Sequence, residues 1–126
     1  MVKILSTQLN GPYPGHAPCK RDKQNKVILE FPLCEPQLFV KEETGNPYGL
    51  GVNHQDGKRY FINLQGTKET RGLPELLVLS PGGPGVSSTK KMTRANFEVC
   101  KELFLNNIDT KQILLDNLPG IEKALA

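Results

Sequence analysis

Residues 46–66 read NPYGLGVNHQDGKRYFINLQG and contain two short runs in which large apolar residues occupy every second position. A strand alternates its side chains between two faces, so each run predicts a strand with one apolar face. Asp56-Gly57 lies between the runs and is a preferred turn dipeptide of antiparallel hairpins. The apolar positions are Tyr48, Leu50 and Val52 in the first run and Tyr60, Ile62 and Leu64 in the second.

The opposite face of the first predicted strand carries two glycines, Gly49 and Gly51. A strand face without side chains leaves room for another backbone or a ligand to approach. We therefore predict partner contact at Gly49 and Gly51.

Further strands are predicted on both sides of this hairpin. Residues 26–31 (KVILEF) alternate, residues 37–43 (QLFVKEE) have the charged character of an edge strand, and residues 75–80 (ELLVLS) form a continuous apolar run. A continuous run of this length indicates a strand that is buried on both faces. The expected fold class is α+β, with residues 26–80 forming a small antiparallel β-sheet or a partly open barrel.

Residues 93–126 have the apolar spacing of helices. Thr93 is suited to cap a first helix, and Asp109 with Gln112 has the spacing of a capping box that opens a second one. The second stripe continues past Pro119, so we predict a C-terminal helical hairpin that is kinked near its end. The two stripes consist of Phe97, Cys100 and Phe104, and of Leu114, Leu118, Ile121 and Leu125.

The N-terminal residues 1–25 are rich in Pro and Gly. Pro12, Pro14 and Pro18 each remove a backbone donor and favour extended geometry in the preceding residue. We therefore predict an extended N-terminal arm that contacts a partner through Tyr13. One α+β domain, residues 26–126, follows this arm, since the chain of 126 residues is too short for two comfortable domains.

Basic residues gather in two places, within a formal net charge of +3. Such groups contact nucleic-acid phosphates or acidic protein surfaces, or they form a solvated face with no partner. We predict partner contact at both groups, and nucleic acid is a possible partner. They consist of Lys20, Arg21, Lys23 and Lys26, and of Lys90, Lys91 and Arg94.

Residues 81–92 read PGGPGVSSTKKM and follow an apolar run, which is the position of a phosphate-binding loop in nucleotide-binding folds. Such a loop needs a Gly-Lys pair at the start of a helix, whereas here Ser88 and Thr89 precede Lys90. Pro81 and Pro84 also remove two of the backbone donors that a phosphate would use. We interpret residues 81–92 as a Gly/Pro loop that connects the sheet to the helices.

The sequence lacks the residue sets of an enzyme or a metal centre. His16 and Cys19 have ligand-like spacing, but the other histidine and cysteines are isolated, whereas structural zinc sites usually comprise two close pairs. We expect no catalytic residue, no metal, no cofactor and no small-molecule substrate.

The segment LPGIEKALA, residues 118–126, resembles the turn of the helix-hairpin-helix family at Leu118, Pro119, Gly120 and Ile121. The resemblance implies a turn that presents backbone N–H groups to a nucleic-acid phosphate. Glu122 stands where that family has a second glycine. We favour the other interpretation, a last helical turn that is opened by Pro119 and packs Ile121 and Leu125.

These observations favour a non-catalytic structural or interaction subunit of a large macromolecular assembly, with protein partners that include copies of itself. Among assemblies, a virion is the expected type, with a capsid decoration, neck or tail role. The alternative is a nucleic-acid-binding module or ribonucleoprotein component. The odd, sparse cysteines and the lack of an apolar span predict a soluble protein, without a membrane partner, that is cytoplasmic when synthesised and possibly located in the virion.

Overall fold

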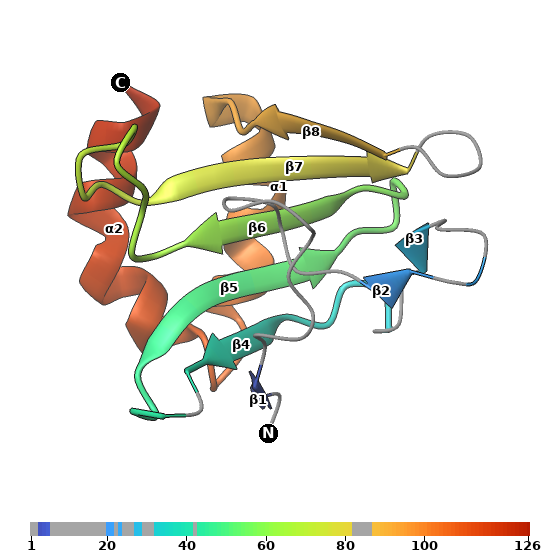
Figure 1. Cartoon of the computed structure of the whole chain (residues 1–126), viewed down its shortest axis with the longest axis horizontal. Coiled ribbons are helices and arrows are strands. Elements are labelled where there is room, and N and C mark those ends of the chain that lie inside the picture. Colours follow the sequence, from blue (N-terminus) through green and yellow to red (C-terminus); the bar gives the residue numbers. More distant parts are fainter. Residues whose placement is uncertain are drawn as a thin grey trace.

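A computed structural model of the chain describes residues 3–5, 20–21, 23, 27–28, 32–41, 43–81 and 87–126. Its main feature is an open sheet with strand order β1-β4-β5-β6-β7-β8 (Figure 1). Strands β4 to β8 are antiparallel to their neighbours, and β1 adds to the β4 edge in parallel. The strands are β1 (Lys3–Leu5), β4 (Gln37–Val40), β5 (Pro47–Asn53), β6 (Arg59–Asn63), β7 (Glu75–Pro81) and β8 (Ser87–Lys91).

The sheet and the two C-terminal helices confirm the predicted α+β class, and the sheet is open rather than a barrel. Strand β4 is not the predicted edge strand, because β1 pairs with it. Of the predicted strand at residues 26–31, the described residues form β3 (Val27–Ile28), which pairs with β2 (Lys20–Arg21) in a separate two-stranded sheet. Most of the predicted arm, including Tyr13, lies outside the described residues, as does Lys26.

The hairpin of β5 and β6 has the predicted apolar faces at Leu50, Val52, Tyr60 and Ile62. Leu50 lies opposite Ile62 and Val52 lies opposite Tyr60, so the apolar alternation of both strands falls on one face. Gly57 closes the turn with a φ of 85°, a conformation that favours glycine.

Tyr48 departs from this pattern. Phe39 of β4 pairs with Gly49 and Val40 with Pro47, which leaves Tyr48 as an extra residue in β5. A bulge of this kind re-aims a side chain. Tyr48 accordingly packs against Phe39, with ring centroids 6.2 Å apart, on the face opposite Leu50.

The prediction that residues 81–92 form a loop is wrong at residue 81, which ends β7, and at residues 87–91. Residues 87–91 form strand β8, which pairs antiparallel with β7 at the sheet edge. Ser87, Ser88 and Thr89 pair with β7 through their backbones. Met92, directly after the strand, is 2% exposed and belongs to the main core. Residues 82–86 lie outside the described part of the chain.

Helix α1 (Arg94–Leu105) begins as predicted. Thr93 is its N-cap and forms a capping box with Asn96. Helix α2 (Lys111–Leu125) begins at a different place from the prediction, because Thr110 rather than Asp109 is its N-cap. The Thr110 hydroxyl donates to the Phe104 carbonyl at 2.8 Å and thereby joins the two helices instead of capping α2.

Helix α2 continues through Pro119, so the helix-hairpin-helix turn that the resemblance implies is absent and the favoured helical interpretation of residues 118–126 agrees with the structure. Proline removes one helical hydrogen bond, but the residues after it are held by packing. Ile121 is fully buried, and Leu118 and Leu125 pack against the same core cluster.

The two helices cover one face of the sheet (Figure 1). The main core lies between them and the sheet, and a smaller cluster of Phe39, Phe61, Leu77 and Leu79 lies on the other face. Strand β7 contributes Leu76 and Val78 to the main core and Leu77 and Leu79 to the smaller cluster. This confirms the prediction that its continuous apolar run is buried on both faces. The main core consists of Leu50, Val52, Tyr60, Ile62, Leu76, Val78, Met92, Phe97, Cys100, Phe104, Leu114 and Ile121.

Candidate interaction site

An apolar stripe runs along the turn before α2 and the outward face of α2, and we call it the α2 stripe: Ile108, Leu115 and Pro119. Ile108 is 93% exposed and Leu115 is 41% exposed. The turn before α2 is already helical in form, because the Lys111 N–H donates to the Asn107 carbonyl four residues back at 2.9 Å. Ile108 therefore leads the row that Leu115 and Pro119 continue at helical spacing.

Polar side chains border the α2 stripe. Lys111, Gln112 and Asp116 are all exposed. The Gln112 side-chain amide donates to Asp116 Oδ1 at 2.8 Å, one turn along the helix. The stripe is thus a narrow apolar row with one cationic and one anionic neighbour, on the side of α2 that faces away from the core.

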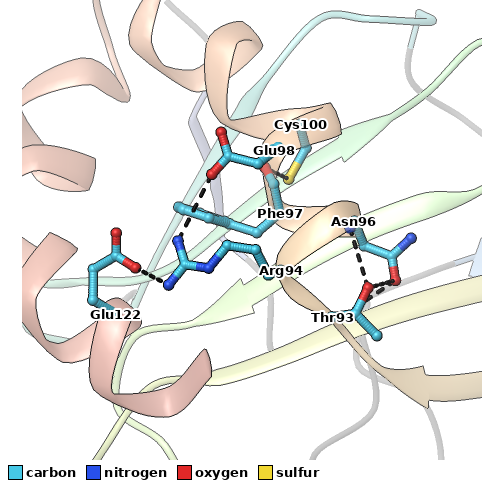
Figure 2. Close-up of polar contacts among 7 residues, drawn as sticks. All are labelled: Thr93, Arg94, Asn96, Phe97, Glu98, Cys100 and Glu122. Atoms are coloured by element: carbon cyan, nitrogen blue, oxygen red, sulfur yellow. Dashed lines mark hydrogen bonds and ion pairs between the residues drawn. The ribbon is translucent and has the colours of Figure 1, made fainter. Parts of the chain in front are cut away.

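Arg94 joins the two helices (Figure 2). Its guanidinium donates to Glu122 of α2 and lies 3.8 Å from Glu98 of its own helix. The hydrogen bond from Arg94 lowers the pKa of Glu122 and raises that of Arg94 itself. Arg94 was predicted to contact a partner, and about half of its side chain remains exposed beside these two carboxylates.

The other predicted basic residues do not form one surface. Lys90 pairs with Val78 and Lys91 with Leu77, so the two exposed lysines point to opposite faces of the β8 edge. Lys20 and Arg21 lie on β2, and the exposed Lys23 follows them in a turn. Figure 1 places β2 and β3 toward the end of the sheet at which β7 ends and β8 begins. Lys90 and Lys91 are the last two residues of β8 and lie at the opposite end.

Aromatic rings of the chain itself fill the space beside Gly49 and Gly51. A Cβ atom added to Gly49 would lie 2.5 Å from Cε1 of Phe61, and one added to Gly51 would lie 2.8 Å from Cε2 of Phe39. The two rings are neighbours, with centroids 5.6 Å apart. The glycines therefore have a packing role inside the chain, and partner contact there stays a prediction.

Three buried polar residues lie on the same face and were missed from the sequence. Arg59 is 2% exposed, and Gln37 and Asn53 are fully buried. Arg59 Nη1 donates to Asn53 Oδ1, and its guanidinium carbon lies 5.6 Å from the ring centroid of Phe39. A buried charge needs such polar and aromatic partners, so we interpret these contacts as stabilising the buried guanidinium of Arg59. Arg59 and Asn53 are cross-strand partners on the hairpin face opposite Val52 and Tyr60, and the sequence alternation already separates these two faces.

The tip of the hairpin has a second polar cluster. The Tyr60 hydroxyl donates to Asp56 Oδ2 at 2.7 Å, and His54 Nδ1 lies 3.4 Å from Asp56 Oδ1. Burial alone would raise the pKa of Asp56, but the hydrogen bonds from Tyr60 and from the Lys58 backbone outweigh it and lower that pKa. Burial and the bond to Asp56 raise the pKa of Tyr60. The cluster fixes the turn.

A pocket of about 470 Å³ lies where the start of β7 meets the end of α2. Its polar groups are two carboxylates, two ammonium groups and the Thr70 hydroxyl. The described residues contain no group of three or more His, Cys, Asp or Glu placed to hold a metal ion. The pocket is lined by Glu69, Thr70, Leu73, Pro74, Glu75, Leu76, Leu77, Lys91, Lys123, Ala124 and Ala126.

Comparison with known proteins finds no family model, no curated protein and no solved structure that matches this chain. Within the described residues, neither helix is both long enough and apolar enough to cross a bilayer. The α2 stripe is therefore the feature from which a function is argued.

Proposed function

We propose that the chain is a non-catalytic subunit that binds other proteins within a larger assembly, and that the α2 stripe is its contact surface. The observation that carries this proposal is the exposure of Ile108, at 93%. A large apolar side chain held almost wholly in water gains free energy when a partner covers it. Leu115 extends the same surface along a rigid helix.

The assembly that we expect is a virion, in a capsid decoration, neck or tail role. This finer proposal is supported by the short chain and by the Pro/Gly-rich composition of residues 1–25. A segment of that composition buries little apolar area of its own, so a partner that orders it must offset the loss of backbone entropy.

The test is the mass at which the epitope-tagged protein sediments in a lysate of its native host. We expect a complex much heavier than 14.0 kDa, unchanged by nuclease treatment. The variant Ile108→Glu should release the protein to light fractions. Val99→Glu is the matched control, because Val99 is an exposed apolar residue of α1 that lies off the stripe, and it should leave the heavy complex intact.

Sedimentation of the native protein as a light species would refute this function. A heavy complex that nuclease dissolves would instead support the alternative, a nucleic-acid-binding module that uses Lys90 and Lys91 on the β8 edge. In that case, affinity for DNA or RNA should fall steeply with salt, because each phosphate contact releases bound counterions.

A further inference from the structure

Together with Gln112, the α2 stripe has the spacing of a coiled-coil seam. The residues Ile108, Gln112, Leu115 and Pro119 are separated by four, three and four positions, which corresponds to heptad positions d, a, d and a. All four are exposed. Glu122 occupies the next d position and is held by Arg94, so the seam ends there.

The residues that flank the seam carry opposite charges at complementary positions. Lys111 is at position g and Asp116 is at position e. In a parallel pair of helices, a residue at g faces the e residue five positions further along the partner helix, and these pairs set partner choice and orientation. Lys111 and Asp116 are five positions apart. One α2 surface thus supplies both members of the pair.

We propose that a second copy of this chain packs against the α2 stripe with the two α2 helices parallel. Lys111 of each copy then meets Asp116 of the other, twice across the two-fold axis. Ile108 and Leu115 pack against their counterparts at the d positions, and the Gln112 amides face each other at a. This inference rests on the proposed function and names a partner for the same surface.

An antiparallel pair does not use these charges. In that arrangement each flank of the helix faces the same flank of its partner, so Lys111 and Asp116, on opposite flanks, never meet. A shifted antiparallel pair could join Asp116 to Lys123 on the shared flank. It would centre between residues 119 and 120 and leave Ile108 outside the contact.

The seam is short, so the dimer is expected to be weak and dependent on protein concentration. The experiment is sedimentation velocity of the purified full chain over a concentration series. We expect a shift from monomer to dimer in the parent protein. Monomer at every concentration up to about 1 mM, the weak end of specific association, would overturn the proposal.

Charge reversal tests the orientation. Lys111→Asp and Asp116→Lys each place like charges at both contacts and should weaken dimerisation about tenfold or more. The double variant restores opposite charges and should return to within about threefold of the parent, as paired charges are exchanged without other change. A double variant no tighter than the two single variants would overturn the parallel pairing.

Ile108→Ser should also weaken the dimer about tenfold or more, because both copies lose a buried apolar side chain. Val99→Ser, off the stripe, should leave it unchanged. Equal effects of these two variants would place the contact elsewhere. Circular dichroism and the thermal midpoint of each variant confirm the fold. Loss of dimerisation in pure protein with the heavy complex intact in lysate would refute the self-contact alone.

Discussion

Replacement of Gly49 by alanine tests whether Phe61 occupies the glycine face. The new Cβ atom would lie 2.5 Å from both Cε1 and Cζ of Phe61 and 3.4 Å from Cδ2 of Phe39. Phe61 is 2% exposed and Phe39 is fully buried, so the Phe61 ring cannot swing into solvent to relieve the contact. The ring or the strand must move instead.

Two opposing effects set the magnitude. Overpacking of a core by one methyl group costs about 1–3 kcal/mol. Glycine to alanine at an unstrained position stabilises by about 0.4–1 kcal/mol, because the unfolded chain loses freedom. Contact at 2.5 Å with a ring that cannot swing out favours the upper part of the penalty, so Gly49→Ala should lose about 2 kcal/mol of unfolding free energy. For a chain of this length, the thermal midpoint should fall by roughly 6–10 °C.

Urea denaturation followed by circular dichroism measures this loss, and a second substitution isolates its cause. Phe61→Leu in the Gly49→Ala background removes the ring edge, so the double variant should be more stable than the sum of the two single losses predicts. Gly120→Ala is the comparison, because its added Cβ would lie 3.2 Å from Cδ of Pro74 and its helical position gains about 1 kcal/mol from alanine. It should change stability little. A Gly49→Ala protein as stable as the parent would refute this account of the face.

Thr93→Ala should lower the unfolding free energy by about 1 kcal/mol in urea denaturation, because the capping box of α1 is lost. Burial raises the pKa of the Cys100 thiol to about 12, so in a timed iodoacetamide reaction read by mass spectrometry the native protein should be alkylated at the partly exposed Cys34 and not at Cys100. Equal labelling of both thiols would contradict the burial of Cys100. The hydrogen bonds of Asp56 lower its pKa below the ordinary value of 3.8, so its stabilisation is present above that pH and is lost as pH falls through the folded-state pKa. The stability difference between the parent and Asp56→Asn, measured by urea denaturation from pH 7 downward, should therefore shrink below about pH 4, and a difference that stays constant with pH would contradict it.

The local signals of the sequence determined much of the fold. The apolar faces of β5 and β6 follow from alternation, the turn between them from Asp56-Gly57, and the start of α1 from Thr93, because these features depend on neighbours in sequence. The errors arose where distant contacts decide. Strand β8 forms by pairing with the edge of β7, and residues 87–91 have no apolar alternation from which a strand could be predicted. By contrast, helix α2 continues through Pro119, as its apolar stripe predicted, and Ile121 beyond the proline is buried in the main core.

The candidate site was harder to predict. The apolar spacing that is visible in the sequence belongs to the buried side of α2, where Leu114, Leu118, Ile121 and Leu125 form the stronger pattern. The α2 stripe has only three apolar residues, and Ile108 precedes the helix itself. Its exposure depends on which side of α2 meets the sheet, which follows from tertiary packing rather than from helical spacing.

The parallel pairing of β1 with β4 has a consequence for the order of folding. Strands β4 to β8 join through chain neighbours, so their contacts form across short loops. Lys3, by contrast, pairs with Leu38, and closing so long a loop costs more chain entropy than any hairpin of the sheet. Strand β1, which is synthesised before the other strands of this sheet, is thus expected to be the last to join it. Until β1 pairs with β4, the unpaired backbone edge of β4 can bind strands of other chains. Aggregation through this edge should therefore decrease when the protein is refolded at low concentration.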